Sequence, residues 1–234
     1  MTLLETRGLT RHFGGLTAVD TVDFQLPAGQ VHALIGPNGA GKSTFVGMVA
    51  GRIPASAGEV WFDGADVTDL PAHARIRLGM AYTFQITAVY ARLSLFDNVA
   101  LALRQRSEPD VLAALDRVGL ADRSAQIAGD LAYGHQRLLE IAMGIAQQPR
   151  LLILDEPTQG LAESEIEGFN ALISRLRAET TILLIEHNMD VVMALADVIT
   201  VLDAGRVLAS GTPEAIRADA AVQEVYLGAG HAQA

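Results

Sequence analysis

The sequence predicts an α/β fold in which a mostly parallel sheet is covered by helices on both faces. Segments with the composition of strands alternate along the chain with segments of helical spacing. Half of the 234 residues are apolar and 22 are glycine, which suits a large buried sheet with many tight turns. A glycine-rich segment, GPNGAGKST, separates an apolar run from a helical segment. Together these observations predict a single large α/β domain.

The first part of the chain predicts an antiparallel β subdomain that leads into this core. Alternation over Leu9–Leu26 suggests two strands joined by a glycine turn, and Gly58–Asp63 suggests an edge strand. The continuous apolar run Val31–Ile35 is typical of a buried parallel strand. A short helix and a further strand are expected at Pro71–Leu78 and Gly79–Phe84.

From Ala88 onward the pattern changes and predicts an inserted helical subdomain. Apolar residues recur at helical spacing in LSLFDNVALALRQ and DVLAALDRVGL, and Ser94 and Asp110 are the expected helix caps. We therefore expect one domain over residues 1–234. Its α/β core is expected to comprise residues 1–87 and 131–234, and its helical subdomain residues 88–130.

Strands and helices alternate again after the insertion. The expected helices are Arg137–Gln147, Glu163–Ala178 and Met189–Ala196, and the expected parallel strands are Leu151–Leu154 and Thr181–Ile185. A terminal hairpin is expected from Val198–Leu202 and Arg206–Ala209. The longest apolar stretch, Val191–Leu202, is too short for a membrane span and contains Asp197, and the first residues lack the apolar core of a secretion signal. Any membrane role is therefore expected to depend on a partner.

The segment Gly36–Thr44 fits the phosphate-binding pattern G-x-x-x-x-G-K-[ST] in full. Its glycines let the backbone curl so that N–H groups point at an anion, and the helix that follows presents its positive end to the same anion. Lys42 can reach the β- and γ-phosphates, and the Ser43 hydroxyl can bind Mg²⁺. The sequence therefore predicts a nucleoside triphosphate site.

Polar residues at the ends of two buried strands complete the predicted site. Asp155 and Glu156 follow LLIL, and ligands of open α/β sheets gather where strands end. Asp155 is expected to hold Mg²⁺, through water, together with Ser43, and Glu156 to polarise an attacking water. His187 follows the strand TILLI and could hydrogen-bond the γ-phosphate or the water; alone, it could equally be a turn residue. Gln85 could bridge Mg²⁺ and the water, or be an ordinary polar loop residue.

The segment LAYGHQRLLEIAMGIAQQP, Leu131–Pro149, places a glycine turn at Gly134 before a helix. A helix N-terminus here would be a second anion-binding site in the same chain. One nucleotide rarely needs two anion-binding helix N-termini from the same protomer. A head-to-tail dimer is therefore expected, with each nucleotide held between the phosphate loop of one copy and this helix of the other.

In their order and approximate spacing, these motifs resemble the ATP-binding-cassette ATPases over nearly the whole chain. The segments LAYGHQRLLEIA, IEHNMDVVMALAD and GTPEAIRADAAVQEVYLG resemble the subfamily that serves importers of branched-chain amino acids and related polar compounds. The resemblance implies that Phe13 stacks on adenine, although it could be a strand core residue. It also implies roles for Gln85 as a γ-phosphate and Mg²⁺ sensor, Glu156 as general base, His187 as switch residue and Gly134 as a contact to the partner's ATP. The triphosphate would be bound by Gly36, Pro37, Asn38, Gly39, Ala40, Gly41, Lys42, Ser43 and Thr44.

Three positions depart from the family pattern. Ala132 replaces the usual signature serine, and His135 stands where glutamine is common. Ala162 replaces the usual aspartate, which puts side-chain coupling between the two sites in doubt. Backbone N–H groups near Gly134 could still bind phosphate.

The resemblance implies a cytoplasmic ATPase on the inner face of the membrane that uses ATP and Mg²⁺ to energise import through separate permease subunits. Its expected partners are the permease, a second ATPase protomer, identical or paralogous, and an external solute-binding protein. Export of an envelope lipid or lipopolysaccharide, or a non-transport role as an ATP-driven clamp, remain alternatives. The net charge of −10 argues against a nucleic-acid partner, and the absence of cysteine excludes disulfides, thiolate metal sites and a cysteine nucleophile.

Overall fold

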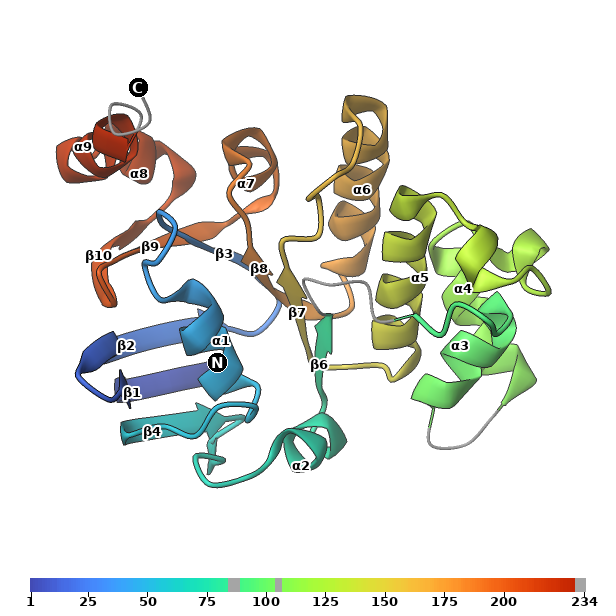
Figure 1. Ribbon diagram of the computed structural model, residues 1–234, viewed down its shortest axis with the longest axis horizontal. Coiled ribbons are helices and arrows are strands. Elements are labelled where there is room, and N and C mark those ends of the chain that lie inside the picture. Colours follow the sequence, from blue (N-terminus) through green and yellow to red (C-terminus); the bar gives the residue numbers. More distant parts are fainter. Residues whose placement is uncertain (84–88, 104–106, 230–234) are drawn as a thin grey trace.

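The computed structural model describes residues 1–83, 89–103 and 107–229 and confirms the α/β class (Figure 1). Within these residues a six-stranded sheet has the order β10-β9-β3-β8-β7-β6. All neighbouring pairs are parallel except β9 and β10, which form the expected terminal hairpin. The strands are β3 (Val31–Ile35), β6 (Met80–Thr83), β7 (Leu151–Asp155), β8 (Thr181–Ile185), β9 (Val198–Asp203) and β10 (Arg206–Gly211).

A second, antiparallel sheet forms the expected β subdomain, with the order β2-β1-β4-β5. Its strands are β1 (Thr2–Phe13), β2 (Leu16–Pro27), β4 (Ala57–Phe62) and β5 (Ala65–Asp66). The expectation that the GEVWFD segment is an edge strand was wrong, because β5 pairs with the outer side of β4. Asp63 and Gly64 have φ of 52° and 77°, so this Asp-Gly pair folds the chain back directly into β5.

Helix α1 (Lys42–Val49) lies between the two sheets (Figure 1). Its Phe45 and Met48 are buried together with residues of the antiparallel sheet and with Leu151 and Ile153 of β7. The alternate residues of β7 face the opposite side of the parallel sheet, where they join the core that the other helices cover. Both faces of the sheet are therefore buried, which accounts for the continuous apolar runs in its strands.

The opposite face of the parallel sheet is covered by α5 (Tyr133–Ala146), α6 (Glu163–Leu176) and α7 (Met189–Leu195). Two further helices, α8 (Pro213–Ala218) and α9 (Ala220–Ala229), follow β10, and the sequence analysis did not predict them. Helix α2 (Ala72–Arg77) precedes β6. None of the helices in the described parts of the chain is long and apolar enough to cross a bilayer.

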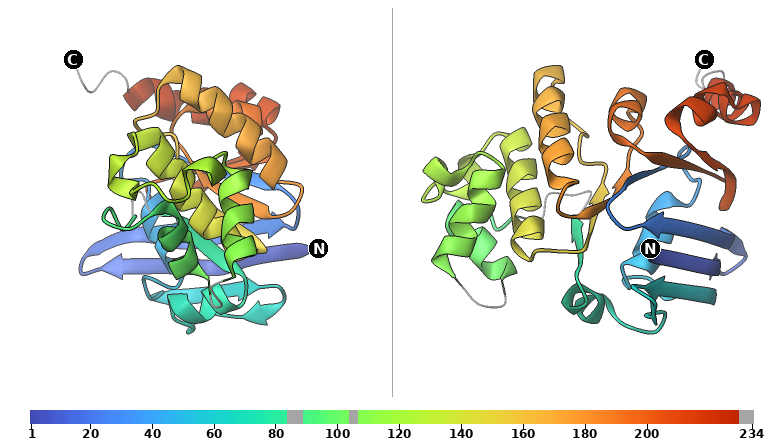
Figure 2. Two further views of the ribbon diagram at one scale, coloured as in Figure 1. Left: turned by 90° about the vertical axis from the view of Figure 1, so that its right-hand side faces the viewer. Right: turned by 180° about the vertical axis from the view of Figure 1, so that it is seen from behind.

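The predicted helical insertion contains α3 (Leu95–Ala102) and α4 (Glu108–Arg117), which pack on α5. They lie at the end of the molecule remote from the antiparallel sheet (Figure 2). Ser94 caps α3 as expected, because its Oγ accepts a hydrogen bond from the Asp97 N–H at 3.0 Å. The expectation for Asp110 was wrong: the cap position of α4 is three residues earlier, at Ser107, and Asp110 lies in the first turn of the helix.

Candidate nucleotide-binding site

The phosphate loop has the strand–loop–helix context that its sequence pattern requires. It leaves the carboxyl end of β3 at Gly36 and enters α1 after Gly41. At both glycines the backbone adopts a positive φ, 151° and 99°. A Cβ at Gly36 would lie 2.2 Å from the carbonyl oxygen of Leu202, and one at Gly41 would lie 2.3 Å from that of Ala18. These two positions therefore require glycine because the loop is wedged between β2 and β9.

Lys42 places its ammonium group within this loop. Its Nζ donates hydrogen bonds to the carbonyl oxygens of Gly36 at 2.6 Å and Pro37 at 3.1 Å. Burial lowers the pKa of Lys42, whereas the nearby carboxylates of Glu156 and Asp155 raise it. The loop thus has a cation at its centre and carboxylates nearby, as expected for a site that binds phosphates together with a metal ion.

Asp155 ends β7 and is almost fully buried, with 3% of its surface exposed. The Tyr82 hydroxyl of β6 donates a hydrogen bond to Asp155 Oδ2 at 2.6 Å. Burial raises the pKa of Asp155, and the hydrogen bond from Tyr82 opposes that rise. Burial and the adjacent carboxylate raise the pKa of the Tyr82 phenol, which therefore keeps its proton. The sequence analysis missed Tyr82, since only the register of β6 against β7 reveals its partner.

A carboxylate and the hydroxyl that begins α1 fit the oxygen ligands that Mg²⁺ prefers. Asp155 supplies the carboxylate, and the exposed Ser43 supplies the hydroxyl. In the described part of the chain no cluster of three or more His, Cys, Asp or Glu side chains could hold a metal ion alone. The donor set therefore fits a metal ion that takes its remaining ligands from nucleotide phosphates and water.

Glu156 and His187 are brought together at the ends of neighbouring strands. Glu156 has an unusual φ of 47°, and its N–H donates to the Ile185 carbonyl of β8 at 2.9 Å. Its Oε1 lies 4.0 Å from His187 Nδ1. The Glu156 side chain is 17% exposed and that of His187 57% exposed, so both can reach a ligand at this edge. A positive φ in a non-glycine residue is strained, and such strain is concentrated at functional sites.

The structure places Phe13 at the end of β1 with 44% of its surface exposed, so Phe13 is not a core residue. The guanidinium carbon of Arg11 lies 4.5 Å from the centroid of the Phe13 ring. Gln85 lies outside the described residues.

The expected turn at Gly134 before a helix from Arg137 was wrong in its bounds. Helix α5 already begins at Tyr133, so Gly134 lies in its first turn. A Cβ at Gly134 would lie 2.3 Å from Glu165 Oε1, and one at Gly160 would lie 3.0 Å from a ring carbon of Tyr133. The loop between β7 and α6, through Gly160, and the first turn of α6, through Glu165, therefore pack against the start of α5 within the chain.

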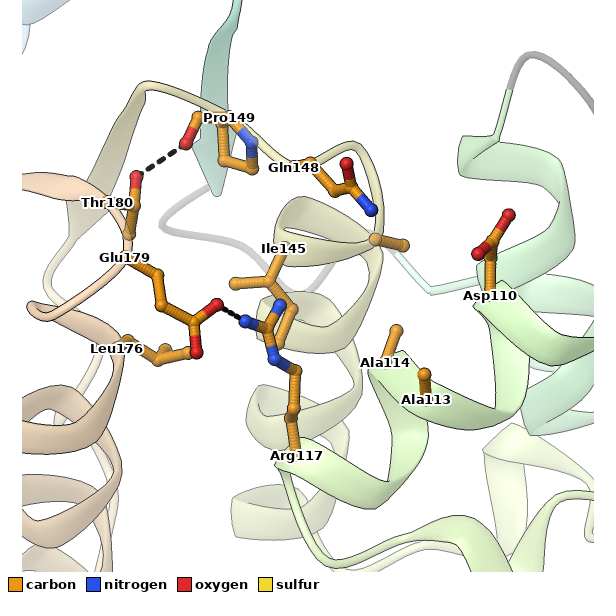
Figure 3. Close-up of a pocket in the computed structure, with 11 residues that line it drawn as sticks. Asp110, Ala113, Ala114, Arg117, Ile145, Gln148, Pro149, Leu176, Glu179 and Thr180 are labelled. Carbon is orange, nitrogen blue, oxygen red and sulfur yellow. Dashed lines mark hydrogen bonds and ion pairs between the residues drawn. The ribbon is translucent and has the colours of Figure 1, made fainter.

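A surface pocket lies elsewhere, between α4, the end of α5 and the segment that precedes β8 (Figure 3). Arg117 of α4 forms an ion pair with Glu179 across it. None of the predicted nucleotide-site residues lines this pocket. Its ion pair joins the helical insertion to the α/β core.

Comparisons with known proteins agree with this geometry. A family model described as ABC transporter matches residues 19–159. A second model, described as branched-chain amino acid ATP-binding cassette transporter, matches residues 206–232. The relatives include the high-affinity branched-chain amino acid transport ATP-binding proteins BraF of Pseudomonas aeruginosa, 38% identical, and LivG of Escherichia coli K12, 36% identical. Each alignment covers 97% of this chain and 98% of the relative.

The lipopolysaccharide export system ATP-binding protein LptB of Escherichia coli K12 is 32% identical over the same shares of both chains. Among solved structures, a nucleotide-free ATP-binding cassette from an ABC transporter superposes with a TM-score of 0.90 at 26% identity, covering 97% of this chain and 99% of that one. Another cassette, in its ADP conformation, gives the same TM-score, identity and coverage. By its sequence, its fold and the arrangement of its phosphate loop, this chain belongs to the ATP-binding-cassette family of ABC transporters.

Proposed function

We propose that this chain is the ATP-hydrolysing subunit of an ABC transporter that imports branched-chain amino acids or related small polar solutes through a separate permease. The observation that carries the proposal is the convergence of Lys42, Asp155, Glu156 and His187 at one edge of the parallel sheet. Full-length similarity to BraF and LivG supports the choice of solute, as does the matched C-terminal model.

In the proposed reaction, the phosphate loop and Lys42 bind the triphosphate of ATP, and Phe13 stacks on its adenine. Asp155 and Ser43 would hold Mg²⁺, with Gln85 as a further ligand; when bound, the ion would neutralise charge on the phosphates. Glu156 accepts a proton from a water whose oxygen attacks the γ-phosphorus. The bond from that phosphorus to the β–γ bridging oxygen breaks, giving ADP and phosphate. His187 donates a hydrogen bond to the γ-phosphate.

We further propose that two such protomers close around two ATP molecules, each bound by one phosphate loop and by the Gly134 helix of the other chain. Residues 88–130 would act as the helical subdomain of this assembly, between core segments 1–87 and 131–234. The permease would dock near Ala88–Arg92, where Tyr90 is 58% exposed and the chain continues directly into the helical insertion. The chain would thus lie on the inner face of the membrane, and an external binding protein would deliver the solute.

The Glu156→Gln variant tests the catalytic part of this proposal. The amide keeps the size of the side chain but cannot accept a proton, so turnover should fall by about 10²- to 10⁴-fold while ATP binding persists. The measurement is steady-state ATPase activity of the purified chain beside equilibrium binding of ATP. Lys42→Ala is the matched binding variant, and it should weaken ATP binding itself. Wild-type turnover in Glu156→Gln would remove Glu156 from the mechanism.

The similarity to LptB supports a second candidate, in which the same ATPase serves an exporter of an envelope lipid. Purification of the tagged chain from membranes, followed by identification of the bound permease, separates the two candidates. Uptake of branched-chain amino acids by the reconstituted complex would support import. ATP-dependent extraction of lipopolysaccharide would support export, and co-purification with ribosomes would favour a clamp.

A further inference from the structure

Glu186, the residue before His187, is fully buried, with 0% of its surface exposed. Its carboxylate stands between the loops that follow β7 and β8. Oε1 accepts hydrogen bonds from the Thr158 N–H at 2.9 Å and from the Thr158 hydroxyl at 2.5 Å. Oε2 accepts from the N–H groups of His187 at 3.0 Å and Asn188 at 3.2 Å. One buried side chain therefore ties two loops of the site together.

The arrangement requires a carboxylate at this position. Each oxygen receives two donors, and the two pairs of donors belong to different loops. A glutamine of the same size has one accepting oxygen and one donating NH₂ group, so it could serve one loop only. The other loop would then face an NH₂ group with its own donors, which leaves buried donors without partners.

Both loops carry residues of the proposed reaction. Glu156 precedes Thr158 by two positions, and His187 directly follows Glu186. The Glu156 N–H also donates a hydrogen bond to the Ile185 carbonyl at 2.9 Å. Hydrogen bonds therefore connect the two segments at two places, between Glu156 and Ile185 and between Thr158 and Glu186. Across these joined loops, Glu156 Oε1 lies 4.0 Å from His187 Nδ1.

We propose that Glu186 is a positioning residue for ATP hydrolysis, which fixes the backbone of His187 against the loop that carries Glu156. The role rests on the proposed function. Glu186 is fully buried and acts through the position of His187, with Thr158 as its anchor on the neighbouring loop. The hydrogen bonds of Glu186 go to Thr158, His187 and Asn188 and not to the phosphate loop or Lys42, so Glu186 should govern turnover rather than ATP affinity.

The test is a double-mutant cycle in the full-length chain with Glu186→Gln, His187→Ala and both together. Glu186→Gln should lower kcat by about 10- to 100-fold, the equivalent of losing hydrogen bonds to a buried charge. The KM for ATP should change by less than about threefold. In the His187→Ala background, Glu186→Gln should lower kcat no further, because the residue through which it acts is already gone. Bound ATP per chain, measured for every variant, corrects for any unfolded fraction.

A role limited to stability would lower the uncorrected activity by the same factor in both backgrounds and leave kcat per ATP-binding chain unchanged, and that outcome would overturn the proposal. Wild-type kcat in Glu186→Gln would overturn it as well. If wild-type protein hydrolyses no ATP, the proposed function fails and this inference with it. If the wild type hydrolyses ATP and Glu186→Gln has the same kcat, the role of Glu186 is contradicted while the proposed function stands.

If Glu186→Gln does not fold, a pair of variants at Thr158 tests whether the hydrogen bonds between Glu186 and Thr158 affect turnover. Thr158→Val keeps the size and the N–H donor but removes the hydroxyl, whereas Thr158→Ser keeps the hydroxyl. Thr158→Val should lower kcat by about tenfold, and Thr158→Ser should stay within about twofold of the wild type. Equal kcat values for the two variants would contradict the proposal.

Discussion

His32 of β3 shows how a single buried residue links the stability of the fold to pH. It is 2% exposed, and its Nε2 lies 2.8 Å from the Thr200 hydroxyl of the neighbouring strand β9. The Phe24 ring packs 4.5 Å from the imidazole, centroid to centroid. Burial lowers the pKa of His32 from 6.5 to about 4, so the folded protein keeps it neutral where the unfolded chain would take up a proton.

Because the pKa of His32 is lowered in the folded state, His32 makes the protein less stable at acidic pH. The contribution of His32 to the free energy of unfolding is complete above pH 6.5 and is lost as the pH falls towards 4. Between about pH 7 and about pH 5 the loss amounts to about 2 kcal/mol. His32→Gln should therefore lose less stability than the wild type over this interval, as measured by urea unfolding at both pH values. The exposed His73→Gln is the control, and an unchanged pH dependence in His32→Gln would contradict the assignment.

At the scale of elements, the two helices of the insertion offer a matched pair of caps. Ser94 Oγ accepts the Asp97 N–H at the start of α3, whereas Ser107 at the start of α4 makes no side-chain capping bond. Ser94→Ala should destabilise the protein by about 1 kcal/mol, and Ser107→Ala should have almost no effect. Thermal unfolding of both variants provides the measurement. Equal changes would mean that the Ser94 bond contributes nothing to stability.

The same elements show what could be predicted from sequence. Continuous apolar runs located the inner strands of the parallel sheet, because a strand buried on both faces has apolar residues at every position. The start of α4 was misplaced, since Ser107 and Asp110 are both acceptable cap residues, and the Pro109 in the first turn favours the earlier start. Thr212, followed by Pro213, carries the same kind of signal for α8, which the sequence analysis overlooked.

The partners of the buried polar residues could not be predicted in this way. Tyr82 meets Asp155 only because β6 pairs with β7 in the register that sets Tyr82 beside Ile153. Glu186 likewise contacts Thr158 only because the loops that follow β8 and β7, far apart in the sequence, lie side by side. The pattern of apolar residues places a strand in the sheet, but the register between parallel strands depends on contacts between distant parts of the chain.

At the scale of the whole molecule, the phosphate loop and Gly134 belong to elements on opposite faces of the parallel sheet. The loop enters α1, which packs between the two sheets, whereas α5 belongs to the core on the other side. This separation supports the proposal that Gly134 serves the nucleotide of a second protomer. The loop from β7 to α6, which begins at Glu156, packs on the start of α5, where Gly134 lies. In the proposed dimer, Glu156 and Gly134 of one chain would act on different ATP molecules, and this packing would link the two sites.

The proposed dimer can be tested by cross-linking, because the chain contains no cysteine and introduced thiols therefore react without background. Asn38 in the phosphate loop and Ala132 before α5 are both exposed. Protein carrying Asn38→Cys is mixed with protein carrying Ala132→Cys, both in the Glu156→Gln background, and treated with a short thiol-specific cross-linker. A cross-linked dimer should form with ATP and not without it, since in the proposed dimer ATP would contact both chains only in the closed state. Gln223→Cys, at an exposed position of α9, replaces Asn38→Cys as the control. A product that ignores ATP, or that forms equally well with the control, would argue against nucleotide binding between two protomers.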